Sequence, residues 1–225
     1  NYFNSIDEDF NISKVAYTSD FGFLPCHSEI RSLMEKTKNI VSSLGWQINA
    51  DHPNLNNSES VFQTLRANLL YAKFKDLYSS HPDKIKPDLA WNIKKGGSLS
   101  SNQIIEAEKM RSELYKNTIN FFENYDLLIA PSAMVPPFEI DKNWVKEVEN
   151  VKFNNYVSWL MTAACISLTG CPSLSISTGF SQQGAPIGIQ IVAPPYQEKK
   201  LLHAAKRIEL STKISTKIPI NVNNE

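Results

Sequence analysis

The stretch "PSLSISTGFSQQGAPIGIQIVA", residues 172–193, contains two apolar runs separated by a turn rich in Gly, Gln and Pro. In the first run serines alternate with Leu174 and Ile176, so the serines share one face of a predicted strand. The second run, "IGIQIVA", predicts a partner strand. Small hydroxyls on one face indicate tight packing or the wall of a polar cavity. A hydrolase nucleophile elbow would need Gly-x-Ser-x-Gly between a strand and a helix, which this hairpin lacks.

Other parts of the chain predict further strands of a sheet. "KVAYTSDFGFLP" gives a short strand at residues 14–18, and "WQI" gives another at residues 46–48. Between them an apolar stripe from Ser28 predicts a helix, which Gly45 ends in a left-handed conformation. The opening fifty residues therefore predict a β–α–β unit. The continuous apolar run at residues 127–130 is typical of a strand buried on both faces.

Periodic apolar residues predict four more helices. They begin at Ser58, at about Ser101, at Phe153 and after "PPYQEKK" near the end of the chain. The helix from Ser58 ends before "HPDKIKP", the next runs to Phe122, and the third ends at Leu168. A polar tail follows from about Ser211, residues 211–225. The predicted fold class is α/β in one domain, residues 1–225, with both ends of the chain contributing to sheet and helices. The residues expected to be buried on the helix from Ser58 are Val61, Phe62, Leu65, Leu69 and Leu70.

Composition excludes several classes of function. Lys and Arg number 23 and Asp and Glu number 23, so no excess of positive charge suggests a nucleic-acid partner. No apolar run is long enough to span a membrane. Three cysteines without a Cys-x-x-Cys pair are typical of a reducing compartment, so we expect a cytoplasmic protein. Because the sequence starts at Asn1 rather than Met, we expect the true N-terminus, with any targeting segment, to lie upstream.

The motif "KKGGSLSS" is a helix start rather than a phosphate loop. No strand precedes it and no Gly-Lys-Ser/Thr follows it. Ser100 and Gln103 instead match the Ser-x-x-Gln capping box of the helix that follows.

Neither the cysteines nor the histidines form a recognisable site. Cys165 falls on an apolar helix as a small core residue, and nothing nearby in the sequence activates Cys171. The four histidines are scattered without metal-ligand spacing, and His203 is expected to be exposed. We therefore predict no metal and no cofactor, and the residues alone offer no complete catalytic set.

The order of three segments resembles the C-terminal half of the amidase signature family. They are "YDLLIAPSAMVPPF", "YVSWLMTAACISLTGCPSLSISTGF" and "GAPIGIQIVAPPYQEKKLLHAAKRIE". The strand ending in the "SDFG" turn and the segment "KPDLAWNIKKGGSLSSNQIIEAEKMRSELY" are also similar to the family. The resemblance covers nearly the whole chain from about Ser13.

This resemblance implies a part of an α/β/α sandwich around a mixed sheet, and an enzyme acting on a small-molecule carboxamide without metal or cofactor. Family chemistry uses a Ser–cis-Ser–Lys set and a serine acyl-enzyme. No segment here matches that set, so we expect the catalytic residues upstream, in a missing N-terminal half of the same protein. The chain alone is then inactive and contributes no catalytic residue.

The resemblance also implies which residues line the acyl-substrate pocket. Two departures from the family pattern are Ser167, where Asn is common, and Ala193, where Gly is common; the first affects substrate preference. The apolar Met134, Ile166 and Trp159 favour a hydrophobic or aromatic acyl group. The residues carried over to the pocket are Ser132, Ala133, Met134, Ile166, Ser167 and Thr169.

Two other functions remain open at this point. One is the A subunit of a tRNA-dependent amidotransferase, which would need partner subunits and a glutaminase reaction. The other is a non-catalytic interaction module derived from an amidase. A homodimer stays open as an assembly.

Overall fold

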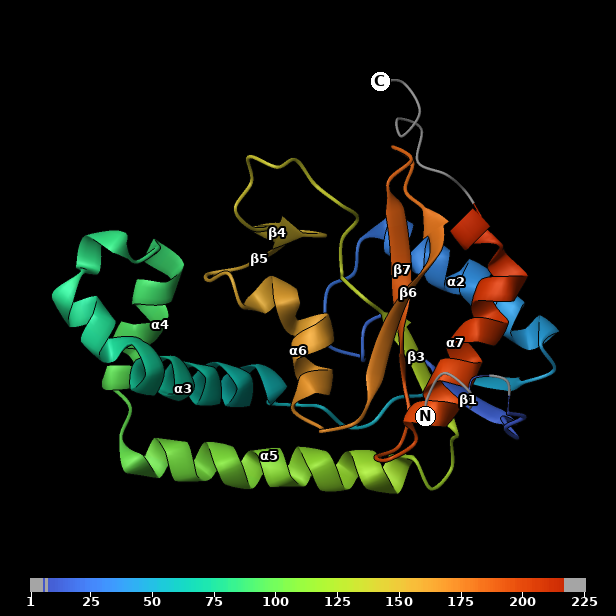
Figure 1. Ribbon diagram of the computed structural model, residues 1–225, viewed down its shortest axis with the longest axis horizontal. Coiled ribbons are helices and arrows are strands. Elements are labelled where there is room, and N and C mark those ends of the chain that lie inside the picture. The colour runs from blue at the N-terminus through green and yellow to red at the C-terminus, as the bar shows by residue number, and fades with distance from the viewer. Residues whose placement is uncertain (1–5, 7, 217–225) are drawn as a thin grey trace.

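A computed structural model describes residue 6 and residues 8–216 of the chain. Its main sheet consists of β1 (Lys14–Tyr17), β2 (Gln47–Ala50), β3 (Leu127–Pro131), β6 (Ser173–Phe180) and β7 (Pro186–Val192). The strand order is β2–β1–β3–β7–β6 (Figure 1). The first three strands are parallel, whereas β7 is antiparallel to β3 and β6 is antiparallel to β7. The sheet is therefore mixed, and every strand expected from the sequence is present.

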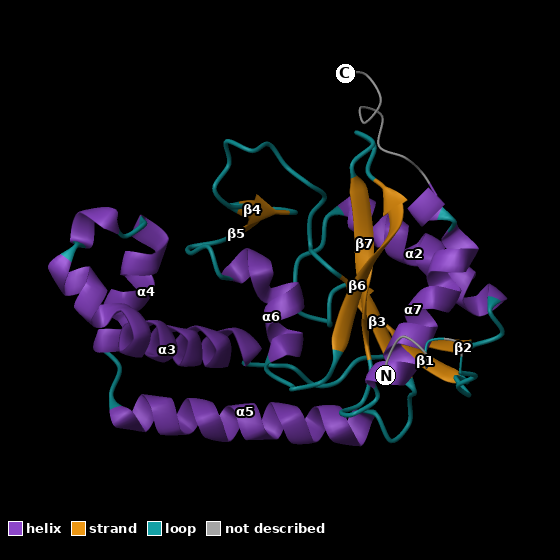
Figure 2. Ribbon diagram, viewed as in Figure 1, coloured by secondary structure: helices purple, strands orange, loops and turns teal. Residues whose placement is uncertain are grey.

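Alternation within the central strand explains how the sheet is covered on both faces. Leu127 and Ile129 of β3 pack into one apolar cluster, and Leu128 and Ala130 pack into another. On the first side lie α2 (Ser28–Ser43) and α7 (Glu198–Thr212), and on the second lies α6 (Met161–Ser167) (Figure 2). These helices and the sheet form an α/β/α arrangement. The predicted burial of β3 on both faces is confirmed.

Three helices extend from the second side of the sheet as an arm (Figure 1). They are α3 (Ser58–Ser80), α4 (Pro87–Gly97) and α5 (Ser101–Phe121), and α3 lies between the other two. The capping box of Ser100 and Gln103 starts α5 as predicted. The sequence prediction did not assign α4, although Pro87 at its first turn is a recognised start signal. At Gly96 an added Cβ would lie 2.1 Å from the carbonyl oxygen of Ala67, so this glycine permits the close contact of α4 with α3.

Asp126 joins the beginnings of β1 and β3 to α7. Its Oδ2 accepts hydrogen bonds from the backbone amides of Ser13 at 2.9 Å and Lys14 at 3.1 Å, and its Oδ1 lies 3.2 Å from Lys200 Nζ. Burial would raise the pKa of this carboxyl, but the two amides and the ammonium group outweigh burial and hold the pKa below its usual value.

Three predicted details are wrong for identifiable reasons. The helix expected from Phe153 begins later, as a 3₁₀ turn at Ser158–Leu160 followed by α6. The Asn155 side chain accepts a hydrogen bond from the Val157 amide at 2.9 Å, and this bond holds the preceding residues in a turn. Leu69 is 65% exposed, because the arm packs through other faces of α3. His203 is buried, with its ring 5.6 Å from that of Phe10.

The described chain ends shortly after α7. At the start of the tail expected from about Ser211, α7 ends at Thr212 and a 3₁₀ turn follows at Ile214–Thr216. The rest of the tail, residues 217–225, lies outside the described residues. In the described ranges, residue 6 and 8–216, no helix is both long and apolar enough to cross a bilayer.

Candidate functional site

A cavity of about 350 Å³ opens where β3 ends. The chain leaves β3 through a turn at residues 132–138, which forms one wall of the cavity. Residues 175–177 of β6 and 186–188 of β7 form the opposite wall. Carboxyl ends of parallel strands are common positions for ligand sites in α/β sheets. The cavity is lined by Ile30, Ser132, Ala133, Val135, Pro136, Pro137, Phe138, Trp159, Ser175, Ile176, Ser177, Pro186, Ile187 and Gly188.

Two serines from separate parts of the chain meet at this cavity, Ser132 directly after β3 and Ser175 within β6. Ser132 Oγ and Ser175 Oγ are 2.6 Å apart, and the Ser132 backbone amide donates to the Gly188 carbonyl oxygen at 3.2 Å. A pair of hydroxyls uses only one of its two hydrogens between its members, so one hydroxyl hydrogen remains for a ligand acceptor. Ser177 differs, because its hydroxyl donates to carbonyl oxygens within the hairpin. Among the described residues, no side chain that lines the cavity is charged or is a histidine, so none of them provides a base beside this serine pair.

Gly188 and Gln190 fix the hairpin against the cavity. A Cβ at Gly188 would lie 2.2 Å from the carbonyl oxygen of Ile176 on the paired strand, so only glycine fits here without a shift of β6 or β7. Gln190 Nε2 donates to the carbonyl oxygens of Pro131 at 2.9 Å and Thr162 at 2.7 Å. One buried side chain thus connects β7 to the end of β3 and to the start of α6.

An aromatic pair forms the outer part of the cavity wall. The rings of Phe138 and Trp159 are 5.5 Å apart and inclined by 79°, an edge-to-face arrangement. Phe138 follows β3, whereas Trp159 precedes α6, so the pair exists only in the folded chain. Both rings contact the cavity, and Phe138 is 38% exposed.

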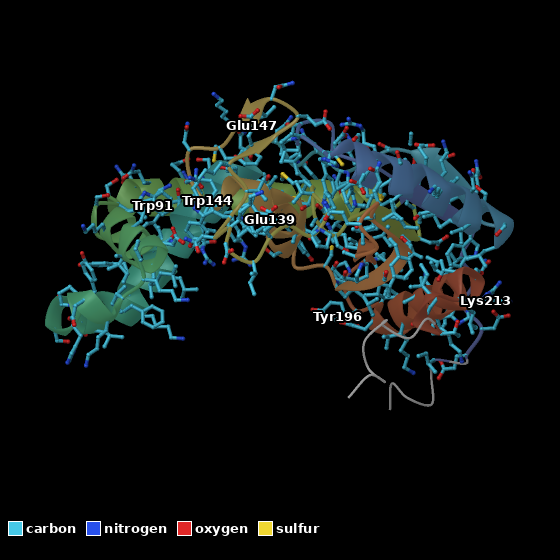
Figure 3. The ribbon with its side chains drawn as sticks, turned by 90° about the horizontal axis from the view of Figure 1, so that it is seen from above. Trp91, Glu139, Trp144, Glu147, Tyr196 and Lys213 are labelled. Atoms are coloured by element: carbon cyan, nitrogen blue, oxygen red, sulfur yellow. The ribbon has the colours of Figure 1, made fainter. Side chains whose placement is uncertain are left out.

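Residues 132–157, which we call the connecting segment, also enclose a second cavity of about 750 Å³. Residues 135–138 are the wall that the two cavities share. The larger cavity carries charged side chains, among them Asp141, Lys142 and Glu147. Figure 3 shows the course of the segment from above, marked by Glu139, Trp144 and Glu147.

A hairpin that the sequence prediction missed attaches the connecting segment to α2. Its strands are β4 (Glu147–Val148) and β5 (Val151–Lys152), and Glu149 and Asn150 at the tip have φ values of 50° and 66°. Glu149 Oε1 accepts a hydrogen bond from the Ser28 amide at 3.0 Å and lies 3.4 Å from the Arg31 guanidinium. The first turn of α2 favours a carboxylate at this position.

The six residues expected in the pocket fall into three pairs. Ser132 and Ala133 line the smaller cavity, whereas Met134 and Ile166 are buried in the core beside it. The remaining two donate hydrogen bonds to the carbonyl three residues earlier in the chain. The Ser167 hydroxyl donates to the Ala164 carbonyl oxygen and the Thr169 hydroxyl to that of Ile166, each at 2.7 Å. Thr169 borders a separate depression against α5. Whether any of the six contacts substrate stays a prediction.

Phe138 and Gln190 are functional candidates that the sequence prediction did not select. The signal for Phe138 was the sequence "VPPF", in which two prolines direct the chain away from the end of β3. The signal for Gln190 was a single polar residue within the apolar run "IGIQIVA". A buried amide in such a strand must find partners, and here it finds the ends of two other elements.

The cysteines are not activated. Burial raises the pKa of the Cys165 thiol to about 12, and burial likewise raises the pKa of Cys26 to about 12. The pKa of Cys171 is also raised by burial. The prediction that Cys165 is a core residue is confirmed. Among the residues that the structure describes, no three His, Cys, Asp or Glu side chains gather in a way that could hold a metal ion.

Comparison with known sequences gives the family. The Amidase family model matches residues 2–202. The A subunit of the glutamyl-tRNA(Gln) amidotransferase of Trichormus variabilis is 32% identical over 108 residues, which cover 48% of this chain and 21% of that protein. The corresponding A subunit of Alkaliphilus metalliredigens is 33% identical over 125 residues, covering 54% of this chain and 24% of the relative.

Solved structures share the fold. A bacterial aryl acylamidase of the amidase signature family superposes with a TM-score of 0.86 at 19% identity, covering 96% of this chain and 46% of that one. The 6-aminohexanoate cyclic dimer hydrolase gives a TM-score of 0.84 at 18% identity, covering 99% of this chain and 50% of the other. The chain therefore spans about half the length of these structures. The resemblance and the α/β fold class expected from the sequence are confirmed.

Proposed function

Because the chain belongs to the Amidase family, we propose that it is the C-terminal portion of an amidohydrolase that cleaves a carboxamide C–N bond. The products are a carboxylic acid and ammonia or an amine. The catalytic residues lie upstream of Asn1, and this chain supplies one side of the substrate cavity. A cytoplasmic location, a small-molecule amide as ligand and the N-terminal half as the principal partner belong to the same proposal.

The observation that carries this proposal is the composition of the smaller cavity. It combines a hydroxyl pair, Ser132 and Ser175, with apolar and aromatic walls, and no base from the described part of the chain lines it. A cavity with few polar groups and no base suits binding and orientation of an amide better than its cleavage. The missing base and nucleophile then belong to the other part of the protein.

The mechanism follows serine acyl transfer. A serine hydroxyl outside this chain attacks the amide carbonyl carbon, the amine leaves with a proton, and water hydrolyses the ester to release the acid. The walls described here hold the acyl group during both steps. Holding the reacting carbon close to the nucleophile is a large part of what such a cavity can contribute.

The alternative enzyme is the A subunit of a tRNA-dependent amidotransferase. It is favoured by the 31–33% identity of this chain to such subunits over about half its length. Against it, glutamine carries an ammonium and a carboxylate group, and none of the described residues that line the smaller cavity has a charged side chain to pair with either. The non-catalytic module and the homodimer stay untested predictions.

The test is an ammonia-release assay with a panel of carboxamides. We expect the protein encoded by the complete reading frame to release ammonia from at least one member, and the 225-residue chain alone to release none. Serine-dependent hydrolysis by the isolated chain would contradict the proposal. Glutaminase activity that requires a second protein would favour the amidotransferase.

A further inference from the structure

We infer that the smaller cavity selects an uncharged aromatic carboxamide and that Phe138 and Trp159 determine this specificity. The inference rests on the proposed amide hydrolysis and narrows its substrate class. It depends on the geometry of the aromatic pair, on the uncharged character of the described lining and on the size of the space.

The aromatic pair can accept a third ring from a ligand in an edge-to-face or offset contact. Its two rings are fixed at 5.5 Å and 79° and both border the cavity. A third ring in the cavity can extend this arrangement, because aromatic quadrupoles favour edge-to-face and offset contacts over random ones. A saturated ring of the same size buries a similar apolar area but has no quadrupole. The pair therefore discriminates by aromaticity as well as by apolar surface.

The lining also discriminates by charge. Among the described residues, its polar side chains are three serines and the Trp159 indole, and Ser177 is satisfied within the hairpin. A charged group placed here would lose its water without gaining a partner of opposite charge, which is strongly unfavourable. The neighbouring larger cavity has charged side chains on the other side of residues 135–138, so neutrality is specific to the smaller cavity.

The size of the cavity fits one ring with its amide. An engineered cavity of about 150 Å³ in another protein holds benzene. The space of about 350 Å³ leaves room for a ring and a small substituent. The free hydroxyl hydrogen of the Ser132–Ser175 pair is a donor for one neutral acceptor on such a ligand.

The experiment compares kcat/KM for benzamide with that for cyclohexanecarboxamide, using the full-length protein. The two amides have six-membered rings and differ in aromaticity, and their intrinsic reactivities cancel when the ratio is compared between variants. We expect Phe138→Leu and Trp159→Leu each to lower the ratio about 2-fold to 10-fold, as for the loss of one aromatic contact. Trp144→Leu, the same change in the wall of the larger cavity, should leave the ratio unchanged.

The charge argument has its own measurement. L-Glutamine should give a kcat/KM at least about 100-fold below that of benzamide, because its two charges find no partners. Preference for glutamine, or a benzamide ratio that neither leucine variant changes, would overturn the inference while leaving amide hydrolysis intact.

A second readout separates this inference from the proposed function. If the full-length protein hydrolyses no amide, the proposed function fails, and ligand-detected NMR with the same two amides then tests the cavity alone. Tighter binding of benzamide that Phe138→Leu weakens would support the aromatic specificity. Equal binding of both amides would refute it.

Discussion

Gln190 tests how the cavity is held in place. Its side-chain amide donates to the carbonyl oxygens of Pro131 and Thr162 from a position that is only 5% exposed. It thereby joins the turn that begins with Ser132 to the segment that carries Trp159. We expect Gln190→Met, which keeps the length of the side chain and removes both donors, to lower the free energy of unfolding.

The magnitude follows from the two lost hydrogen bonds. Each contributes about 0.5–1.5 kcal/mol net, and a buried carbonyl left without a partner adds about 1–3 kcal/mol. Partial relaxation of the β3 end reduces the sum, so we expect a loss of about 2–4 kcal/mol. With a urea dependence of about 2–3 kcal/mol per molar, the unfolding midpoint should fall by about 1 M.

The assay is urea denaturation at neutral pH, followed by tryptophan fluorescence and circular dichroism. Ser173→Ala is the matched control, because the Ser173 hydroxyl contacts the other end of the Gln190 amide at a long 3.4 Å. We expect the control to change the free energy of unfolding by less than about 0.5 kcal/mol. A Gln190→Met protein within about 0.5 kcal/mol of the original would refute the reasoning.

The substitution Gln190→Glu adds a signature that simple loss of packing lacks. A carboxylate at this buried position would face two carbonyl oxygens, which raises its pKa in the folded state above the unfolded value of about 4.3. The folded state then binds the proton more tightly than the unfolded state. The deficit in stability should therefore grow as pH rises from about 4 through the raised pKa. A deficit independent of pH would contradict this account.

Four further predictions follow from the described contacts. Glu149→Gln should release the hairpin tip from α2, so that trypsin cleaves after Lys146 faster than in the original protein; an unchanged cleavage rate would show that the ion pair does not hold the segment. Asp126→Asn should lower the free energy of unfolding at pH 7 by about 1–2 kcal/mol. Because the folded pKa is depressed, the carboxylate contribution is complete above the unfolded pKa of about 3.9 and is lost as pH falls through the folded pKa, so the two proteins should converge in acid urea titrations. A thiol reagent at pH 8 should modify at most Cys171 in the folded chain and all three cysteines in urea, and rapid modification of all three without urea would contradict the burial. Gly188→Ala should cost about 1–3 kcal/mol in the same urea assay, because its Cβ would collide with a strand carbonyl; a neutral substitution would show that β6 can move away.

The elements that the sequence predicted correctly are those whose signals are local. The run at residues 127–130 is apolar at every position because β3 is covered on both faces, and this pattern needs no knowledge of the neighbours. Ser100 and Gln103 form their capping box within one turn of chain, and Gly45 takes its left-handed conformation directly after α2. The two apolar runs at residues 172–193 formed their hairpin for the same reason.

The predictions that failed depended on what packs where. Leu69 has helical spacing, but α3 lies in the arm and that position faces solvent. His203 looked polar and exposed, yet it packs against Phe10, which is almost two hundred residues away in sequence. Apolar spacing also placed the start of the predicted helix at Phe153. In the structure the Asn155 side chain accepts a hydrogen bond from the Val157 amide, and the residues form a turn instead.

By itself the sequence determined the α/β class and most strands and helices, since these follow from periodicity and turn residues, and the order of its motifs indicated the family. That the turn after β3 contacts substrate stays a prediction. Only the tertiary structure decided which side chains meet there. Ser132 and Ser175 are 43 residues apart, Phe138 and Trp159 belong to separate segments, and Gln190 reaches two other elements. Such contacts depend on strand order and register, which place distant residues within hydrogen-bond distance and leave no trace in the spacing of either residue alone.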